Sequence, residues 1–191
     1  FFSTNAIFQN ANTGYTYDIR NFGATTASSN NAIQIQRAID KAHVNGGGTV
    51  YFPRINNKNW KSGKLIMYAN VKLLGDGIGD TLQSATADTL ITYQNNDFTQ
   101  AEGARIKGLT LWGNNIGTVG LSMQLLYHFS FDLKISNFTN YGIYSKGSLI
   151  GQFENLLVES CNTGILLDSF NAPSPTLLVA PNIIIFRGGE I

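Results

Sequence analysis

Three similar segments decide the fold of this chain: Val119-Gly120-Leu121-Ser122-Met123, Tyr141-Gly142-Ile143-Tyr144-Ser145 and Thr163-Gly164-Ile165-Leu166-Leu167. Their glycines lie 22 residues apart, and further apolar segments occur at 106–111, 131–135 and 153–158, with another beginning at residue 183. A leucine-rich repeat has a similar period, but its leucine and asparagine spine is absent and no amphipathic helix fits between the segments. The pattern instead predicts coils of three short strands and three turns, stacked as a parallel β-helix.

Alternation along the apolar segments predicts which side chains fill this stack, because every second side chain of a strand points to the same face. The predicted inward residues are Leu109, Leu111, Leu133, Ile135, Leu156 and Val158. Phe138 and Cys161 occupy turn positions that are expected to bury a side chain. Asn and Gly, with 21 and 20 copies, suit the many turns that such coils need.

Composition excludes several classes of protein. The 191 residues carry 13 Lys and Arg against 12 Asp and Glu, and a net charge of +1 argues against a nucleic-acid partner. The single cysteine cannot form an intrachain disulfide, and no Cys and His cluster has zinc spacing, so we expect no metal and no cofactor. No apolar run approaches the roughly 18 residues of a membrane span, so we expect no membrane insertion. The chain opens at Phe1 without Met, and we interpret it as a fragment or processed piece.

The N-terminal third has a different pattern. Residues 31–45 place Ala and Ile at spacings of three and four, which predicts an amphipathic helix. Asn30 or Asn31 would cap it, and Gly46-Gly47-Gly48 would end it. Strands are predicted at 49–52, 64–67 and 71–75. A helix in this position would cover the apolar end and unpaired strand edges of the first coil.

One string of motifs resembles a known family. Asp18-Ile19-Arg20-Asn21-Phe22-Gly23-Ala24 is similar to the opening of pectate-lyase-like β-helix proteins, and the resemblance continues through 31–40, 46–53 and 71–82. The family is the pectate lyase superfamily, which includes the β-helix tailspikes of bacteriophages. The resemblance implies a right-handed parallel β-helix that commonly acts on polysaccharide and, in tailspikes, a homotrimer. A candidate apolar flank for a trimer is Tyr127-His128-Phe129.

Some motifs of the family are missing. A polygalacturonase would carry NTD, DD, GHG and RIK elements in that order. Arg105-Ile106-Lys107 spells the last of them, but neither histidine is flanked by glycine, and we interpret this string as a chance match. The calcium and arginine constellation of pectate lyases is not recognisable either. A secreted pectinolytic enzyme is therefore disfavoured, and a tailspike or surface depolymerase, located on the virion tail, is favoured.

Two acidic residues share the period of the glycines. Asp132 and Glu154 lie 22 residues apart, and each follows a phenylalanine. Glycoside cleavage uses two carboxyl groups about 5 to 9.5 Å apart, and neighbouring strands lie roughly 4.8 Å apart. We therefore predict a catalytic pair on the outer face, with Glu159 as a third acid on the rung of Glu154. A register with a step of 23 would instead place Asp132 beside Asn155.

Other residues are predicted to bind the sugar. Lys134 would balance the charge of the pair, and His128 is the histidine near it in sequence. Aromatic faces suit the C–H faces of pyranose rings. The aromatic candidates expected at outward positions are Trp112, Tyr127 and Tyr144, and Trp60 is also expected to be exposed. Paired acids favour hydrolysis, whereas β-elimination would need a base beside a uronate, for which Lys134, His128 and Tyr127 are available.

These patterns lead to one domain arrangement and two candidate functions. Residues 1–14 are interpreted as an extension or linker and 15–191 as the β-helix domain. Within that domain we expect a cap region at 15–55 and rungs at 56–191 that are truncated at the C-terminal end. The favoured function is a tailspike-type protein that binds and cleaves a bacterial surface polysaccharide. The alternative is a non-catalytic glycan-binding or structural spike segment whose catalytic region lies elsewhere.

Overall fold

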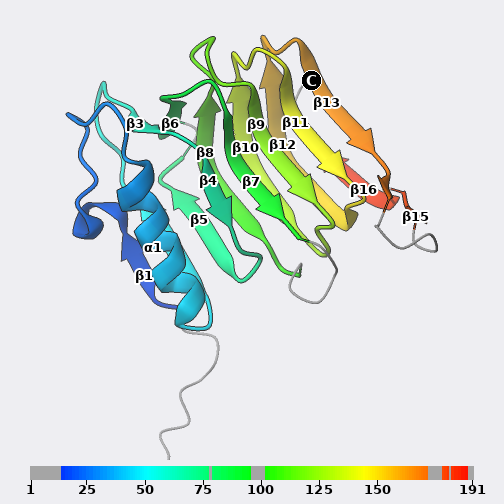
Figure 1. Ribbon diagram of the computed structural model, residues 1–191, viewed down its shortest axis with the longest axis horizontal. Coiled ribbons are helices and arrows are strands. Elements are labelled where there is room, and N and C mark those ends of the chain that lie inside the picture. Colours follow the sequence, from blue (N-terminus) through cyan, green and yellow to red (C-terminus); the bar gives the residue numbers. More distant parts are fainter. Residues whose placement is uncertain (1–13, 78, 96–101, 172–177, 181, 189–191) are drawn as a thin grey trace, which may run out of the picture.

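The computed structural model describes residues 14–77, 79–95, 102–171, 178–180 and 182–188. Nearly all of the expected N-terminal extension lies outside these ranges, as does the C-terminal end of the chain. Within them, no helix is both long and apolar enough to cross a membrane. The chain winds mostly through parallel strands into a stack of coils, with one α-helix at the N-terminal end of the stack (Figure 1).

Two parallel sheets form the walls of this stack. Sheet A follows the order β1-β2-β5-β8-β10-β12-β16, with β6 also beside β8 and β3 beside β6, and sheet B follows the order β13-β11-β9-β7-β4. The strands of sheet A are β1 (Thr16–Asp18), β2 (Gly48–Phe52), β3 (Trp60–Ser62), β5 (Val71–Gly75), β6 (Thr81–Ser84), β8 (Arg105–Trp112), β10 (Ser130–Ser136), β12 (Leu149–Glu159) and β16 (Asn182–Arg187). Those of sheet B are β4 (Leu65–Met67), β7 (Thr89–Gln94), β9 (Val119–Gln124), β11 (Tyr141–Lys146) and β13 (Thr163–Asp168). A short antiparallel pair, β14 (Phe170–Asn171) and β15 (Leu178–Val179), follows β13. Strands of successive coils are neighbours throughout, which confirms the predicted parallel β-helix.

Sheet A bends along a line that crosses β8, β10 and β12. Before the bend Asp132 pairs with Glu154, a step of 22, whereas after it Lys134 pairs with Leu157, a step of 23. The extra residue is Asn155, whose φ of 48° lies in the left-handed region. Both registers considered from the sequence are therefore present, one on each side of the bend, and Asp132 lies beside Glu154. A complete coil has the three straight segments that were predicted: two halves of a sheet A strand and one strand of sheet B.

The interior is filled by the side chains that alternation assigned to it. The six predicted inward residues, from Leu109 to Val158, are each at most 4% exposed. Phe131 and Phe153 pack beside them on neighbouring rungs, with ring centroids 5.8 Å apart. Phe138 is buried as expected, and Cys161 is half-buried against the core, where burial raises the pKa of its thiol.

Two aromatic residues expected on the surface are instead buried. Trp60 is 3% exposed within β3, and its indole N–H donates a hydrogen bond to the carbonyl of Pro53 at 3.0 Å. The prediction failed because a strand of three residues is too short to show alternation. Phe129, from the expected apolar flank, is 2% exposed. It follows His128, whose φ of 51° interrupts the extended backbone and hence the alternation.

The repeated glycines mark places where a side chain has no room. A Cβ atom on Gly142 would lie 2.7 Å from the carbonyl oxygen of Gly164 and 2.6 Å from the side chain of Val158. A Cβ atom on Gly120 would likewise lie 2.7 Å from the carbonyl oxygen of Gly142. The glycine period in the sequence is therefore a packing requirement that recurs on successive rungs.

Helix α1 (Ala32–Val44) covers the N-terminal end of the stack as predicted, and a short 3-10 helix, η1 (Ile19–Phe22), precedes it (Figure 1). Asn31 is the N-cap residue of α1 but makes no side-chain capping bond; the side-chain oxygen of Asn30 instead accepts a hydrogen bond from the N–H of Ala32 at 2.9 Å. Gln36 joins the helix to sheet B: its amide accepts from the N–H of Ile66 and donates to the carbonyl of Ile66, both at 2.9 Å. Since Ile66 lies in β4, the edge strand of sheet B, the helix protects an edge that would otherwise be open to pairing.

Candidate functional site

The predicted carboxylate pair, Asp132 and Glu154, lies on the outer face of sheet A. The two residues are register partners on β10 and β12, and both line a cleft of about 280 Å³ that we call the acid cleft. Adjacent parallel strands lie roughly 4.8 Å apart, which fits the separation of about 5 to 9.5 Å between the two acids of a glycosidase. The preceding residues, Phe131 and Phe153, are buried, and this anchoring turns both acids outward.

Three basic residues line the same cleft: Lys72, Arg105 and Lys107. Lys107 is the register partner of Asp132, and Lys72 is that of Arg105. Neither lysine forms an ion pair with any residue that the structure describes. The acid cleft therefore combines two carboxyl groups with three cationic side chains, and two of these, the lysines, have no ion-pair partner among the described residues, which suits a polar or anionic ligand.

The sequence interpretation of Arg105-Ile106-Lys107 as a chance match overlooks these cations. In the structure the string alternates along β8, so Ile106 is buried and its two basic neighbours face the cleft. Alternation applied to these three residues was a sufficient signal to find them. Lys72 carried no such signal, because its place beside Arg105 depends on a strand register between segments that are not similar in sequence.

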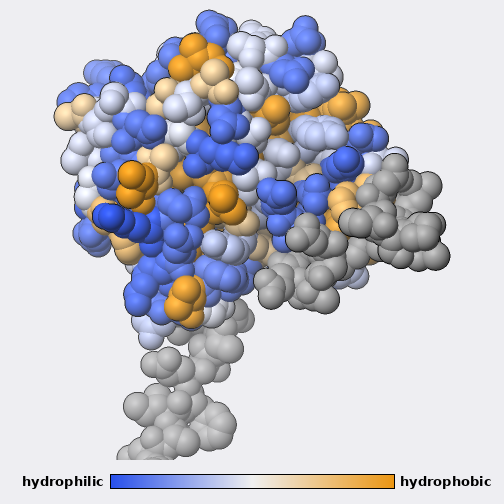
Figure 2. All heavy atoms as spheres, in the orientation of Figure 1, coloured by the Kyte–Doolittle hydropathy of each residue, from blue (hydrophilic) through white to orange (hydrophobic). Residues whose placement is uncertain are grey.

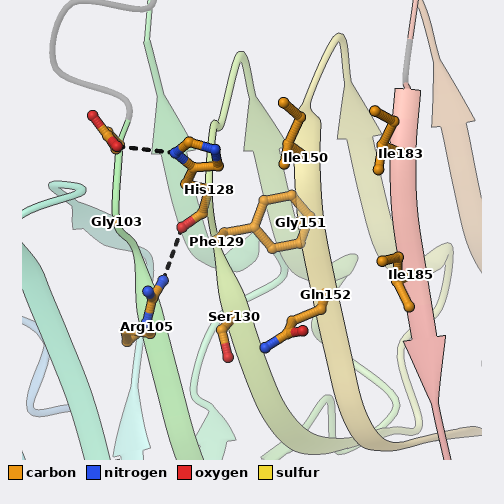
Figure 3. A pocket seen from close by; sticks show the side chains of 11 residues that line it. Gly103, Arg105, His128, Phe129, Ser130, Ile150, Gly151, Gln152, Ile183 and Ile185 are labelled. Carbon is orange, nitrogen blue, oxygen red and sulfur yellow. Dashed lines mark hydrogen bonds and ion pairs between the residues drawn. The ribbon is translucent and has the colours of Figure 1, made fainter.

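A second hollow adjoins the acid cleft on the outer face of sheet A, and Figure 3 shows its lining. This His128 pocket has a volume of about 400 Å³ and shares Arg105 and Ser130 with the acid cleft. At its rim, Nδ1 of His128 lies 2.9 Å from Oε1 of Glu102. Arg105 donates a hydrogen bond to the carbonyl of His128 at 2.8 Å, and the ring of Tyr127 lies 3.8 Å from that of His128.

One further side chain links the two hollows. Gln152 lines the His128 pocket, and its Nε2 donates a hydrogen bond to Oε1 of Glu154 at 2.7 Å. Glu154 in turn lines the acid cleft. This bond restricts the orientation of the longer of the two paired acids. The acid cleft and the His128 pocket are therefore joined on the outer face of sheet A before the bend.

Three predicted site residues lie beyond the bend, apart from this surface. Lys134 and Glu159 form an ion pair with an N–O distance of 2.5 Å, so Lys134 balances Glu159 rather than the carboxylate pair. Trp112 ends β8, where it is the register partner of Ser136. The structure thus brings together the carboxylate pair and His128 with Tyr127, and it separates Glu159, Lys134 and Trp112 from them.

Tyr144 lies on sheet B rather than in the acid cleft. Its ring stacks with that of Tyr141, with centroids 5.5 Å apart, and its hydroxyl donates a hydrogen bond to Oδ2 of Asp168 at 3.3 Å. Burial, and then the nearby carboxylate of Asp168, raise the pKa of the Tyr144 phenol. Lys146 is the register partner of Asp168. We call these four residues the tyrosine cluster.

The described residues hold no grouping suited to a metal ion, and one face of the molecule is mostly hydrophilic. Within the residues that the structure describes, no three His, Cys, Asp or Glu side chains are grouped so that they could hold a metal ion. The face that presents α1 is mostly hydrophilic, with small and separate hydrophobic areas (Figure 2). Such a surface can exchange hydrogen bonds with the hydroxyl groups of a sugar.

Comparison with known proteins identifies relatives by sequence. The chain is 34% identical over 116 residues to "Alginate lyase 7" and 35% identical over 113 residues to the mannuronan C5-epimerase AlgE6, both from Azotobacter vinelandii. Each match covers 54% of this chain but only 13% of the relative. The chain therefore corresponds to a small part of these proteins. No protein-family profile matches it.

Solved structures share the architecture over most of the chain. ORF18 of Geobacillus virus E2 matches with a TM-score of 0.75 and 20% identity, over 90% of this chain and 35% of that one. The A-module of the mannuronan C-5 epimerase AlgE4 of Azotobacter vinelandii matches with a TM-score of 0.73 and 19% identity, over 91% and 50%. At such identities the likeness concerns the fold. Taken with the two parallel sheets, the bend and the cap helix, it shows that the chain has a right-handed parallel β-helix fold.

Proposed function

We propose that the chain is part of a tailspike-type protein that binds a bacterial surface polysaccharide along the outer face of sheet A and hydrolyses it there. The observation that carries this proposal is the carboxylate pair, because Asp132 and Glu154 are register partners within one cleft. A virus protein of the same fold supports the tailspike assignment. Relatives named for alginate and mannuronan support a polysaccharide as the ligand.

The geometry of the pair suggests how hydrolysis would proceed. One carboxylic acid protonates the oxygen of the scissile glycosidic bond, and the other carboxylate attacks the sugar carbon on the opposite side. A rung spacing of roughly 4.8 Å is closer to the separation of about 5 to 5.5 Å used by retaining enzymes than to that of inverting ones, so we expect net retention. The three cations of the acid cleft favour a glycan that carries negative charge.

The test compares the wild-type chain with an Asp132→Asn/Glu154→Gln double variant, which keeps the shape of both side chains. Both are incubated with capsular, lipopolysaccharide and teichoic-acid glycans and with alginate. Reducing ends, ultraviolet absorbance of a new double bond, and binding by calorimetry are followed. We expect the variant to lose reducing-end release by more than about 10³-fold while binding persists. The matched control is Asp88→Asn, an exposed acid between β6 and β7, which should cleave as the wild type does.

A second chemistry is favoured by the tyrosine cluster on sheet B. Removal of the C5 proton of a uronate is the first step of β-elimination and of C5 epimerisation, and the relatives are named as a lyase and an epimerase. The raised pKa of Tyr144 keeps its phenol protonated and suits it to donate a proton. Lys146, one rung away from Asp168, is the base that the cluster offers. In that case Tyr144→Phe, not the carboxylate double variant, should abolish an ultraviolet-absorbing product.

The same assays separate the candidate functions. Reducing ends without ultraviolet absorbance, lost in the carboxylate double variant, support hydrolysis at the acid cleft. Absorbance that disappears in Tyr144→Phe supports elimination at the tyrosine cluster and contradicts the hydrolysis proposal. Binding without cleavage by the wild type favours the non-catalytic spike segment.

A further inference from the structure

The His128 pocket holds a pair of residues that glycosidic hydrolysis at the acid cleft does not need. Nδ1 of His128 lies 2.9 Å from a carboxylate oxygen of Glu102. Because an ionised carboxylate only accepts hydrogen bonds, Nδ1 carries the proton of the neutral ring and the lone pair of Nε2 is available. Figure 3 shows the second ring nitrogen on the side of His128 that faces Ile150, away from Glu102. An imidazole oriented by a carboxylate in this way can act as a general base.

The backbone places this imidazole through an unusual conformation. His128 has a φ of 51°, and its neighbours on the next two rungs, Ile150 and Ile183, have φ values of 47° and 54°. The left-handed region is unfavourable for β-branched residues, and strain of this kind persists where the surrounding structure fixes it, often at functional sites. The three residues line the rim of one pocket on three successive rungs. These three residues with left-handed backbone therefore shape the pocket around the imidazole.

The wall opposite His128 and Arg105 is apolar. It consists of Ile150, Ile183 and Ile185, which are 37%, 57% and 41% exposed (Figure 3). A bare pyranose presents mainly hydroxyl groups to such a wall, whereas an acyl substituent presents a methyl or alkyl group that gains by burial there. The pocket thus offers an apolar surface beside a base and a guanidinium. The side chains of His128 and Glu102 also remain accessible to water, because they are 44% and 66% exposed.

We propose that the His128 pocket hydrolyses acyl esters, such as O-acetyl groups, on sugars of the bound polysaccharide. Nε2 of His128 takes a proton from a water molecule, and the water oxygen attacks the ester carbonyl carbon. Arg105 stabilises the negative charge that develops on the carbonyl oxygen. The bond from the carbonyl carbon to the sugar oxygen then breaks, and the imidazolium gives its proton to that oxygen. The products are a free acid and a free sugar hydroxyl. This inference rests on the proposed polysaccharide ligand but not on the chemistry of the carboxylate pair.

The test follows acetate release from chemically O-acetylated alginate and from O-acetylated methyl glucosides. His128→Asn removes the base while keeping a residue that tolerates the left-handed conformation, so the fold should survive, and thermal unfolding checks this. We expect acetate release to fall by about 10² to 10⁴-fold, the usual contribution of a general base. His43→Ala is the matched control, because it removes the other imidazole, which stacks on Tyr68 beside α1, and it should leave the rate unchanged.

Two further variants separate acetate release from cleavage of the polysaccharide. Glu102→Gln should slow acetate release, with a lower kcat and little change in KM, because the imidazole then loses the carboxylate that orients it and fixes its proton on Nδ1. The Asp132→Asn/Glu154→Gln variant should still release acetate when it no longer cleaves. Equal acetate release in His128→Asn and wild type overturns the proposal, as does the absence of release from every acetylated probe. Loss of an ultraviolet-absorbing product in His128→Asn would also overturn it, because the imidazole would then serve elimination.

Discussion

At the scale of a single residue, Asp18 both caps the N-terminus of η1 and forms an ion pair with Arg20. Its Oδ1 accepts a hydrogen bond from the backbone N–H of Arg20 at 2.9 Å, and its Oδ2 lies 2.6 Å from the Arg20 guanidinium. The side-chain hydrogen bond from Arg20 is the main reason that the pKa of Asp18 lies below its ordinary value of 3.8. The bonds hold the start of η1, at the beginning of the motif that resembles the family.

This arrangement predicts how stability depends on pH. A carboxyl group whose pKa is lower in the folded state adds stability above its unfolded pKa, and this contribution disappears as the pH falls through the folded pKa. Asp18→Asn keeps a backbone acceptor and removes the charge, so it should destabilise the protein at neutral pH but not well below pH 3.8. Because the Arg20 side chain is 57% exposed, we expect a loss of less than about 1 kcal/mol. Urea unfolding of both proteins at neutral and acidic pH measures it, and a difference that persists in acid would exclude the charge as its source.

The positions and partners of some residues could be predicted from the sequence, whereas those of others could not. Asp132 and Glu154 were accessible because their spacing matched the glycine period and each followed a phenylalanine. The pairing of Lys134 with Glu159 was not, because it depends on how far two long side chains reach across a bent sheet. The burial of Trp60 depends on a hydrogen bond to a carbonyl seven residues away, which no local pattern encodes.

At the scale of elements, the bend of sheet A controls whether the carboxylate pair exists. Asn155 supplies the extra residue in β12, and its left-handed backbone lets Glu154 stay in register with Asp132 while the rest of the strand continues with a shifted register. The equivalent position in β8 is Gly108, with a φ of 66°. Asn and Gly are the residues that adopt this conformation at low cost.

Substitutions at Asn155 should therefore follow backbone conformation rather than side-chain polarity. Asn155→Gly should leave the free energy of unfolding nearly unchanged, whereas Asn155→Val should lower it by about 1 to 2 kcal/mol and reduce any cleavage that depends on the acid cleft. Chemical unfolding and the reducing-end assay measure the two effects. Asn140→Val is a matched control at an exposed position outside the left-handed region. Equal losses in Asn155→Gly and Asn155→Val would mean that the amide contacts, not the conformation, hold the bend.

Elements with a regular period were predicted well. The cap helix followed from its apolar stripe and its Gly stop, and the strands of the later coils followed from the glycine repeat. The bend was not predicted, because the step of 22 that aligns Phe131 with Phe153 and the step of 23 that aligns Leu133 with Leu156 were treated as alternatives for the whole strand. Only the paired strands show that the chain uses one step on each side of Asn155.

At the scale of the whole molecule, the stack places distant segments in one row. Because each coil contacts mainly the coils next to it, a side chain on the outer face meets its counterparts about one rung away, regardless of the sequence between them. Lys72, Arg105 and Ser130 come together in this way from three strands. A polysaccharide bound across these rungs would contact charges from distant segments of the chain. This explains why the sequence did not reveal Lys72, whereas alternation along Arg105-Ile106-Lys107 was enough to reveal the other two cations.

This arrangement predicts that the chain binds a polyanionic glycan through the cations of the acid cleft and not through its net charge, and that this binding weakens as the salt concentration rises. The net charge of +1 gives the whole chain little attraction for a polyanion, so we expect the attraction to arise from a local group of cations, as in the acid cleft. A Lys72→Ala/Lys107→Ala variant should bind a polyuronate such as alginate more weakly than the wild type by about 10-fold, because two ligand contacts at about 0.7 kcal/mol each are lost. Its affinity should also vary less with salt, since exposed charges are screened within about 10 Å at 0.1 M ionic strength. Binding to a neutral glycan should not change.

Calorimetry at two salt concentrations measures these effects, with Lys41→Ala on α1, an exposed lysine outside the cleft, as the control. If the control weakens binding as much as the double variant does, the polyanion recognises lysines in general, and the acid cleft is not the place where it binds.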